Sequence, residues 1–376
     1  MTTVRFGVVG LGSIGSRHAA YLNNLAGGKL AAVCDAHVDL ANRIGGELKV
    51  PAFQDYRPML ASKQIDAVLI ATPHFQHPPI ALAAFDAGVH VLCEKPLAVS
   101  VKQAQTVIEA AAKKPNLKFG LMFQQRTWPI YSQAKQLLAS GEMGEILRVT
   151  WTITDWFRTN AYYASGGWRA TWDGEGGGVL LNQCPHNLDL LWWLTMLKPK
   201  NITAIAKIGA THPIEVEDEV AALLEYDGSA IGQFITSTGE APGSNRLEIA
   251  TDRGLLIAEP GRLTVRRTEQ SVRELRQTGS ANVRVTPTVD KVHEFGPEPR
   301  DAHKQITQNF IDAILQGDPL IAPGADGVHG LEIGNAILMA GLTRRSVSLP
   351  LDADAYEDFL TRLASQSPGK KQTSAA

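Results

Sequence analysis

The stretch VRFGVVGLGSIG, which spans Val4–Gly15, decides the fold that this sequence predicts. Six β-forming residues, Val4–Val9, lead directly into a glycine-rich turn and then into a helix with apolar periodicity. Gly10 permits the tight turn, Gly12 leaves room for a phosphate group, and Gly15 lets the helix pack closely on the strand. Such a turn presents backbone N–H groups and a helix N-terminus to a pyrophosphate. The stretch therefore predicts a dinucleotide-binding site, with an ordinary βα turn as the alternative.

Asp35 strengthens this prediction, because it ends the next expected strand, Leu30–Cys34. It follows the glycine turn by about twenty residues, the spacing at which a carboxylate reaches the adenosine ribose hydroxyls. A carboxylate there also repels the extra phosphate of NADP, and no arginine follows immediately, so NAD is the expected cofactor and NADP is less favoured. The turn and this carboxylate supply the first expected cofactor contacts, which are Gly10, Gly12, Ser13, Ile14, Gly15 and Asp35.

The composition suggests two ordinary domains, because 376 residues are many for one hydrophobic core. A hydrophobic content of 44% with 20% charged residues is typical of a globular protein. With 36 basic and 38 acidic residues, the chain has no net field to attract nucleic acid or an anionic membrane. Cys34, Cys93 and Cys184 form no C-x-x-C pair, and neither a membrane-spanning apolar run nor a signal peptide is apparent. A cytoplasmic location is therefore expected.

Residues 1–124 alternate apolar strands with amphipathic helices, which is typical of a doubly wound parallel sheet covered on both faces. The expected strands are Val4–Val9, Leu30–Cys34, Ile65–Ala71, Val89–Cys93 and Leu117–Met122, and the expected helices are Ile14–Leu25, Val38–Leu48, Pro79–Ala87 and Val101–Ala112. Ligands of such sheets bind outside the carboxyl ends of the strands. Residues just beyond those ends should therefore line the ligand crevice, and they include Thr72, His74, His77, Glu94, Lys95, Gln124 and Arg126.

Residues 125–364 predict a second, α+β domain that binds substrate and forms oligomers. Helices are expected at Ile130–Ala139, Asn182–Met196, His303–Leu315 and Leu331–Thr343, and strands at Ile146–Asp155, Ile202–Gly209, Glu219–Tyr226, Ala230–Thr238, Arg246–Thr251, Leu255–Glu259 and Leu263–Arg267. Short turns between strands favour a large, open, mostly antiparallel sheet with helices on one face. A partner subunit is a common cover for the other face. The small and polar residues 365–376 are expected to form a disordered tail.

Lys95 is the first candidate for chemistry, because Glu94-Lys95-Pro96 comes directly after a strand expected to be buried on both faces. A lysine at such a strand end points into the ligand crevice, where its neighbours can lower its pKa toward a useful value. Pro96 fixes the direction of the chain as it leaves the strand. The alternative is a lysine that only forms a salt bridge or binds phosphate.

The second candidate region is GEGGGVLLNQCPHNLDLLWWL, residues Gly174–Leu194. Its three consecutive glycines would let the backbone pass close to a ligand before a helix begins. Asn182 and His186 are four residues apart and would share one face of that helix, with Asp189 one turn further on. Pro185 must then lie in the first helical turn. Two alternatives stay open: Asn182 as the N-cap of the helix, and His186 as a core histidine packed under an aromatic loop.

A metal site is not expected from this sequence. Cys184, His186 and Asp189 are possible zinc ligands by type, but C-x-H-x-x-D is not a recognised structural spacing. His74 and His77 could be offered as ligands on the same basis, although residues at a strand end fit better as part of the cofactor crevice. We therefore expect neither group to bind a metal ion.

An aromatic group favours either core and subunit packing or stacking on a sugar ring and closure over the nicotinamide. It consists of Trp151, Trp156, Tyr162, Tyr163, Trp168 and Trp172. Arg169 lies among these residues and could bind either hydroxyl groups or phosphate. The residue types alone do not decide between these uses.

Four blocks, GLGSIGSRHA, ATPHFQH, CEKPLA and GGGVLLNQCPHNLDLLWWL, occur in an order and spacing that resembles the glucose–fructose oxidoreductase / inositol dehydrogenase / MocA (Gfo/Idh/MocA) family over nearly the whole chain. The resemblance implies an N-terminal Rossmann domain and a C-terminal domain whose large open sheet often forms dimers or tetramers. A homodimer or homotetramer is therefore expected. The resemblance also implies NAD(P)-dependent oxidation or reduction of one ring hydroxyl of a sugar, anhydrosugar, glycoside or inositol.

The resemblance assigns catalytic roles to three positions. The family's lysine in E-K-P maps onto Lys95 and its helix histidine onto His186, whereas its usual aspartate maps onto Asn182, which is a departure. An amide cannot accept a proton at neutral pH, so Asn182 is expected to orient His186 or bind a hydroxyl. We expect a substrate hydroxyl between Lys95 and His186, with His186 taking its proton as hydride leaves for the nicotinamide and Lys95 stabilising the developing alkoxide.

These assignments complete the expected site. The expected substrate-binding residues are Lys95, Arg126, Asp155, Tyr163, Asn182 and His186, and Trp168 and Arg169 are expected to contact the cofactor. Two other activities are open, because some relatives use tightly held NAD to cleave glycosidic bonds by transient oxidation and one is a non-catalytic regulator that keeps the fold. The presence of both Lys95 and His186 argues against the regulator.

Overall fold

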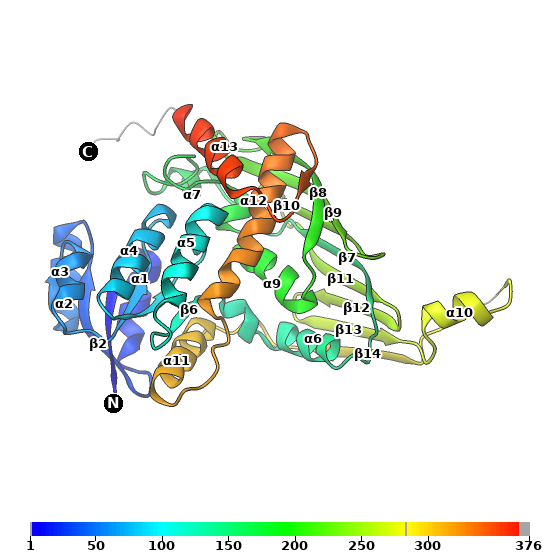
Figure 1. Ribbon diagram of the computed structural model, residues 1–376, viewed down its shortest axis with the longest axis horizontal. Helices are drawn as coiled ribbons and strands as arrows, with labels where there is room; N and C mark the ends of the chain where they lie inside the picture. Colours follow the sequence, from blue (N-terminus) through cyan, green and yellow to red (C-terminus); the bar gives the residue numbers. More distant parts are fainter. Residues whose placement is uncertain (1, 283, 368–376) are drawn as a thin grey trace. The chain divides into compact units, whose positions relative to one another are not determined.

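The computed structural model describes residues 2–282 and 284–367, and it divides the chain into two compact units. The first unit comprises the chain up to Thr127 together with Asp173–Gly176 and Arg300–Leu331. The second comprises Trp128–Trp172, Gly177–Pro299 and the chain from Glu332 onward. The sequence colouring of Figure 1 shows that the first unit joins blue and cyan elements to the orange helix α11 (Ala302–Leu315).

The first unit is built on a six-stranded sheet in the order β3-β2-β1-β4-β5-β6. All pairings are parallel, which confirms the predicted sheet, and the strand order reverses between β1 and β4, where doubly wound sheets bind ligands. The strands are β1 (Val4–Val9), β2 (Gly28–Cys34), β3 (Ala52–Phe53), β4 (Ala67–Ile70), β5 (His90–Cys93) and β6 (Phe119–Leu121). The helices between them are α1 (Ser13–Leu22), α2 (Val38–Leu48), α3 (Tyr56–Ala61), α4 (His77–Asp86) and α5 (Val101–Ala112).

Helix α11 packs on this sheet, so the first unit extends beyond the contiguous range 1–124 that the sequence suggested. The ring of Phe310 lies against Phe6 of β1, with 6.3 Å between the centroids. A Cβ added to Gly120 of β6 would meet the Phe310 ring at 3.1 Å, and one added to Gly28 would meet Ile311 at 2.9 Å. Apolar contacts between segments this far apart in the sequence leave no local periodicity to detect.

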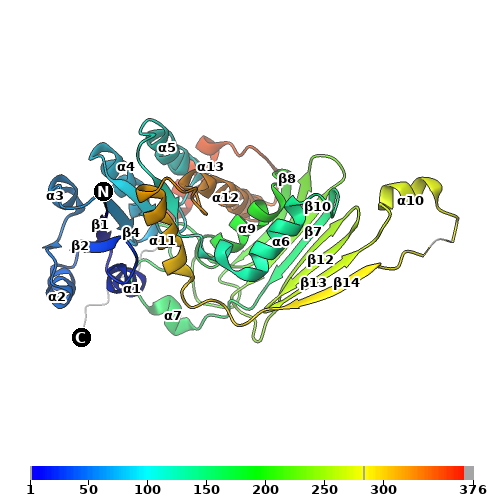
Figure 2. The same ribbon diagram turned by 90° about the horizontal axis from the view of Figure 1, so that it is seen from below.

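The second unit is built on a nine-stranded sheet in the order β14-β13-β12-β11-β7-β10-β9-β8-β15. Only β7 and β10 pair in parallel within it, so the predicted sheet is confirmed as mostly antiparallel. Helices α6 (Pro129–Ala139) and α9 (Pro185–Thr195) contact each other, and Figure 2 shows both on one face of the sheet. The strands are β7 (Ile146–Ile153), β8 (Pro199–Ile208), β9 (Glu217–Tyr226), β10 (Ile231–Ser237), β11 (Asn245–Thr251), β12 (Gly254–Glu259), β13 (Arg262–Arg267), β14 (Val289–Glu294) and β15 (Val347–Ser348).

The other face of this sheet exposes apolar side chains. Ile205, Leu223 and Ile231 are 49%, 60% and 59% exposed. The register pairs Ile205 with Ala221 and Leu223 with Gln233, so these side chains share one face. Exposed apolar patches of this kind are typical of interaction surfaces.

The predicted helix Asn182–Met196 is wrong at its start. The structure has a short helix α8 (Val179–Asn182) and a separate α9 that begins at Pro185, with Cys184 as its N-cap. Proline lacks an amide hydrogen and restricts the residue before it, so the helix begins at the proline. Asn182 therefore ends α8, and it neither caps α9 nor shares one continuous helix with His186.

The sequence patterns did not predict several short elements of the second unit. These include α7 (Asn160–Ala164), α10 (Val272–Thr278), which Figure 1 shows beyond the β13–β14 pair, and α13 (Ala353–Ser365), which follows α12 (Gly327–Thr343). The predicted disordered tail is wrong for its first residues, because Ser365 ends α13 and Ser367 Oγ donates to Glu215 Oε1 at 2.5 Å. Residues 368–376 lie outside the described residues. Within the described ranges, no helix is long and apolar enough to cross a membrane.

Candidate active site

The turn after β1 requires glycine at two positions. Gly10 has a φ of +87°, and its N–H donates to Cys34 O at 2.9 Å. A Cβ on Gly10 would lie 2.6 Å from Ala71 O, and one on Gly15 would lie 1.8 Å from Gly10 O. A side chain cannot occupy either place, so both glycines are needed to bring the strand, the turn and α1 together.

Gly12 and Ser13 lie on the open side of this turn. Both are exposed, and a Cβ on Gly12 would meet nothing within 4 Å. Gly12 is the N-cap of α1 and offers no side-chain hydrogen bond, so no cap covers the first N–H groups of the helix, which include those of Ser13 and Ile14. These amides and the positive end of the helix dipole fit the pyrophosphate of a dinucleotide.

The carboxylate of Asp35 is fixed beside the turn. Its Oδ2 accepts from Leu11 N at 2.7 Å, and its Oδ1 accepts from His37 N at 2.9 Å. Each carboxylate oxygen can accept a second hydrogen bond, so Asp35 still has capacity for the two hydroxyls of a ribose. Its place at the end of β2 therefore fits the expected cofactor contact.

The two histidines after β4 are buried. His77 Nδ1 lies 2.7 Å from Pro96 O and its Nε2 lies 2.8 Å from Thr72 O, and burial lowers the pKa of His77. His74 Nδ1 lies 3.0 Å from Glu175 O. Both ring nitrogens of His77 face backbone carbonyls beside two strand ends, so His77 helps to position these ends, and its expected cofactor contact stays a prediction.

A buried chain of hydrogen bonds lies behind the Glu94-Lys95 strand end. His18 Nε2 lies 2.8 Å from Glu94 Oε1, and His18 Nδ1 lies 2.5 Å from Tyr21 Oη. Tyr21 Oη lies 2.9 Å from Thr307 Oγ1, which donates to His303 O at 2.9 Å. His18 and Thr307 are fully buried, and Glu94 is 7% exposed. The chain connects α1, β5 and α11 within the first unit.

The Glu94 carboxylate at the end of this chain is ionised. Burial alone would raise the pKa of Glu94, but the hydrogen bond and charge of His18 lower it to about 2. Glu94 is therefore ionised and accepts a hydrogen bond from His18 Nε2.

Lys95 follows this buried ion pair directly and is partly exposed. Its N–H donates to Glu94 Oε2 at 3.3 Å, and the next carbonyl, that of Pro96, lies against His77. Buried groups therefore hold the backbone on both sides of Lys95, which fixes the place from which its side chain extends.

Sequence reasoning missed His18 and its partners as part of the site. A local signal existed, because His18 and Tyr21 are three residues apart on α1 and both lie on its buried side. The contact with Glu94 spans 76 residues and that with Thr307 spans 286, and no local pattern reveals such pairs.

Arg126 has structural contacts within the first unit, and its expected contact with substrate stays a prediction. Its guanidinium is almost fully buried, and Nη1 donates to Asp326 Oδ2 at 2.7 Å and to Ile321 O at 3.1 Å. It also stacks on Phe123, 5.4 Å from the ring centroid. A buried guanidinium that is paired in this way holds the end of β6 against the segment 321–326 of the same unit.

The glycine run before α8 approaches a neighbouring strand instead of the expected ligand. A Cβ on Gly178 would lie 2.0 Å from Glu217 O in β9. The carboxylate of Glu217 is fully buried and accepts from Gly178 N at 2.8 Å and Leu180 N at 3.1 Å. Glu217 therefore supplies the hydrogen bonds that the start of α8 needs and ties this segment to the sheet.

Helices α8 and α9 carry the second set of candidate residues. Asn182 is partly exposed at the end of α8, and His186 is 5% exposed as the second residue of α9. The N-cap Cys184 has its Sγ 3.1 Å from Thr236 Oγ1 in β10, and Asp189 is buried. Across the residues that the structure describes, no group of three or more His, Cys, Asp or Glu side chains could hold a metal ion. An imidazole such as that of His186 can act as a general base.

The aromatic loop is held by its own polar contacts. Tyr163 is buried, and its hydroxyl donates to Thr238 Oγ1 at 2.9 Å, so it packs in the core and its expected contact with substrate is not supported. The guanidinium of Arg169 stacks on Tyr162 and Trp168, 4.7 Å from each ring centroid. Arg169 Nη1 also donates to Tyr162 Oη at 2.8 Å. The cofactor contacts expected of Trp168 and Arg169 stay predictions.

Gln124 and Asp155 lie where a ligand could reach them. Gln124 begins the short 3₁₀ helix Gln124–Thr127 and is partly exposed, and Asp155 follows β7 and is exposed. Thr72 is partly exposed after β4. The ligand contacts expected of these three residues stay predictions.

Known proteins share this architecture. The Gfo/Idh/MocA "Oxidoreductase family, NAD-binding Rossmann fold" matches residues 4–121, and the Gfo/Idh/MocA C-terminal domain matches residues 131–257. The inositol 2-dehydrogenase of Corynebacterium glutamicum is 34% identical over 377 residues, which cover 95% of this chain and 98% of that protein. The chain therefore belongs to the Gfo/Idh/MocA family.

Other Gfo/Idh/MocA proteins match over shorter lengths or at lower identity. The inositol 2-dehydrogenase of Salmonella paratyphi B is 35% identical over 150 residues, and the match spans 39% of this chain and 45% of that protein, about half its length. The structure of a levoglucosan dehydrogenase in complex with NADH and L-sorbose has a TM-score of 0.77 and 22% identity over 93% of this chain and 100% of that one. That likeness shows the shared fold alone.

Proposed function

We propose that this Gfo/Idh/MocA protein is an NAD-dependent dehydrogenase that acts on a ring hydroxyl of a sugar, anhydrosugar, glycoside or inositol. The observation that carries the proposal is the buried His18–Glu94 pair, because it anchors Lys95 at the same edge of the sheet as the glycine turn. The names of the inositol 2-dehydrogenases that the chain resembles support the reaction class.

NAD, when bound, supplies or accepts the hydride. The N–H groups at the start of α1 would hold its pyrophosphate, and Asp35 would hold its adenosine ribose. Asp35 would also repel the additional phosphate of NADP.

Three side chains carry out proton transfer, charge stabilisation and orientation. The Lys95 ammonium stabilises the charge that develops on the substrate oxygen, and His186 takes the hydroxyl proton. Asn182 cannot accept a proton, so it orients His186 or binds a second hydroxyl. This proposal assigns proton transfer to His186 and electrostatic stabilisation to Lys95.

Replacement of Lys95 by alanine tests the proposal. Lys95→Ala should lower turnover by about a thousandfold, the scale of a lost charge-stabilising donor, and leave NAD affinity within about threefold of the wild type. Lys102→Ala, at an exposed position of α5, is the matched control and should keep full activity. Wild-type turnover in Lys95→Ala would refute the role.

The substrate can be identified by measuring NADH formation with a panel of monosaccharides, inositols, anhydrosugars and glycosides. The same panel is tested in parallel with NADP as the cofactor. Release of reducing sugar without accumulation of NADH would instead indicate glycosidic cleavage by transient oxidation. Binding of NAD without turnover of any panel member would indicate a regulator. Either result would contradict the proposed dehydrogenase.

A second copy of the chain is the proposed cover for the exposed sheet face, which gives a homodimer or homotetramer. The exposed Ile205 and Leu223 support this assembly. A cytoplasmic location is also proposed, because Cys34, Cys93 and Cys184 are buried and free, as expected in a reducing compartment.

A further inference from the structure

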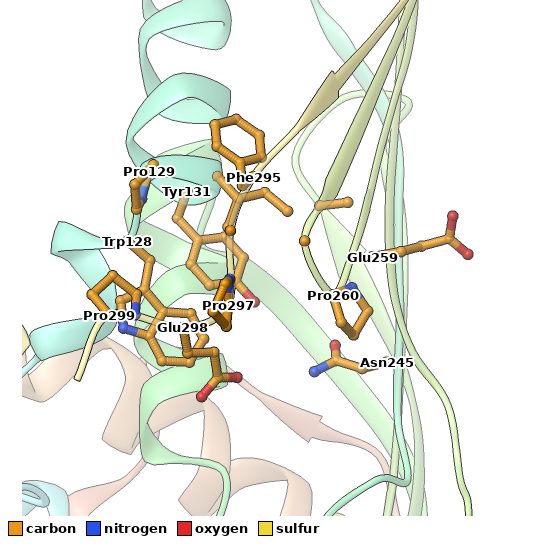
Figure 3. Close-up of a pocket in the computed structure, with 14 residues that line it drawn as sticks. Trp128, Pro129, Tyr131, Asn245, Glu259, Pro260, Phe295, Pro297, Glu298 and Pro299 are labelled. Atoms are coloured by element: carbon orange, nitrogen blue, oxygen red, sulfur yellow. The ribbon is translucent and has the colours of Figure 1, made fainter.

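A pocket in the second unit has no part in the roles described above. It lies between the start of α6, the β12–β13 turn and the segment 295–299, as Figure 3 shows. Its volume of about 420 Å³ is in the range of small-molecule sites. Trp128, Tyr131 and Phe295 form aromatic walls, prolines complete them, and none of the lining residues is basic.

Two polar groups on the aromatic walls lack a protein partner. Trp128 and Tyr131 stack with 5.8 Å between ring centroids and 17° between planes. Tyr131 is 6% exposed, and among the described residues neither its hydroxyl nor the buried Nε1 of Trp128 has a hydrogen-bond partner. Figure 3 shows the Tyr131 side chain extending toward Pro297 and Glu298. Because buried polar groups in native proteins are almost always hydrogen-bonded, the Trp128 Nε1 points to a ligand with oxygen atoms.

Glu298 lines the pocket, and the charge of a second carboxylate, Asp155, acts on it. Loss of surrounding water and the charge of Asp155 raise the pKa of Glu298. Asn245 Oδ1 accepts from Trp151 Nε1 at 3.1 Å, so its NH₂ group is the donor to Asp155. Within the described ranges, no arginine or lysine forms an ion pair with either carboxylate. The rim therefore carries negative charge that a cationic ligand would neutralise.

Glu259 provides a contrast on the same pocket. Its Oε1 accepts from Arg246 Nη1 at 2.7 Å, and Figure 3 shows its carboxylate directed away from the aromatic walls. The charge of Glu259 is thus already compensated within the protein. It should contribute little to a ligand, which makes it a matched control for Glu298.

We infer that this pocket binds a sugar or cyclic polyol that carries an ammonium group. The ammonium group neutralises the rim carboxylates and suits the faces of the aromatic rings. Ring hydroxyls satisfy the Trp128 N–H and the Tyr131 hydroxyl. An anionic ligand would meet the Glu298 carboxylate with no basic lining side chain to offset it, and a neutral ring would leave the repulsion between Glu298 and Asp155 in place. The inference concerns binding alone, and it holds whether or not the bound molecule is the one oxidised.

Calorimetric titration of the full chain without NAD tests this inference. The probes are D-glucosamine, D-glucose and N-acetyl-D-glucosamine, which share a ring and differ in charge, in a phosphate buffer because amine buffers would compete. Glucosamine should bind about tenfold more tightly than either neutral sugar, the scale of one charge-assisted contact with aromatic support. Choline, a cation without ring hydroxyls, should bind more weakly than glucosamine.

Substitutions of lining residues then test whether this pocket causes the preference for glucosamine over glucose. Glu298→Gln should lower glucosamine affinity by about tenfold and change glucose affinity less than twofold, whereas Glu259→Gln should change neither. Trp128→Phe should weaken both sugars, because it removes the N–H donor and keeps an aromatic ring. Equal binding of glucosamine and glucose, equal binding of choline, or an unchanged preference in a folded Glu298→Gln protein would overturn the inference. Because none of these measurements uses turnover, failure of the dehydrogenase proposal would not affect them.

Discussion

Replacement of His18 by leucine should remove about 3 kcal/mol of stability. The structure places the buried His18 ring 2.8 Å from the ionised Glu94. His18, together with the charges of His303 and Lys95, lowers the pKa of Glu94 from an ordinary 4.5 to about 2 against the effect of burial, and at about 1.4 kcal/mol per pKa unit this shift corresponds to ~3 kcal/mol. Loss of one partner of a buried ion pair costs about 3–5 kcal/mol in other proteins, which agrees with this value.

The pH dependence of the effect follows from the direction of the shift. Because folding lowers the pKa of Glu94, its stabilising contribution is complete above pH 4.5 and is lost as the pH falls toward about 2. In His18→Leu the buried carboxylate has lost its partner, so folding is opposed wherever Glu94 would be ionised. The difference between the wild type and His18→Leu should therefore shrink as the pH falls from 4.5 toward about 2.

Urea unfolding followed by circular dichroism measures the effect, and a double-mutant cycle with Glu94→Leu isolates the pair. Each single variant should lose about 3 kcal/mol of unfolding free energy. The loss in the double variant should be smaller, by about 3 kcal/mol, than the sum of the two single losses. His37→Leu, an exposed histidine of the same unit, should cost less than about 0.5 kcal/mol. All seven tryptophans lie in the second unit, so their fluorescence reports that unit separately. Additive losses in the cycle would refute the ion pair.

Three further predictions follow from the turn, the carboxylate and the sheet face. Gly15→Ala should lower the melting temperature of the first unit, because its Cβ would overlap Gly10 O. Gly12→Ala should leave the melting temperature unchanged and lower the affinity for NAD, as measured by titration. Asp35→Ala should lower NAD affinity and raise the ratio of NADP to NAD turnover, and an unchanged ratio would contradict its place at the ribose. Leu223→Glu should dissociate the proposed oligomer in sedimentation without a change in circular dichroism, whereas a wild-type sedimentation coefficient would exclude this face as the interface.

The elements of the first unit were largely predictable from the sequence, because strand and helix periodicities alternate there without interruption. Helices α2 and α5 begin and end at the predicted residues, and β1 does as well. The turn also followed from composition, since only glycine suits Gly10 and Gly15 in their observed surroundings. Local sequence is sufficient where backbone conformation and burial pattern decide the structure.

Contacts between residues far apart in the chain could not be predicted from local sequence patterns. Arg126 looked like a ligand contact because it follows a strand end, yet it is buried against Asp326, 200 residues later. Tyr163 was expected to contact a ligand, yet its hydroxyl donates a hydrogen bond to Thr238. In both cases a partner that is distant in the sequence gives the side chain a structural contact that no local pattern predicts, and the ligand contact stays a prediction.

At the start of α9 two local sequence patterns favour different first residues. Proline is favoured at the first position of a helix, so Pro185 predicts a helix that begins there and not at Asn182. The four-residue spacing between Asn182 and His186 favours a single helix that contains both residues. A spacing that suits one helical face is weaker evidence than a residue that cannot donate a backbone hydrogen bond.

The scaffold around Asn182 bears on its departure from the family aspartate. Helix α8 is held by Glu217 through the amides of Gly178 and Leu180, and α9 is set by Pro185. These backbone constraints do not depend on whether position 182 carries an amide or a carboxylate. Asparagine has nearly the shape of aspartate and lacks its charge, so the departure alters the chemistry available to His186 while leaving its support in place. Any proton that His186 takes must therefore leave by a route other than a carboxylate at position 182.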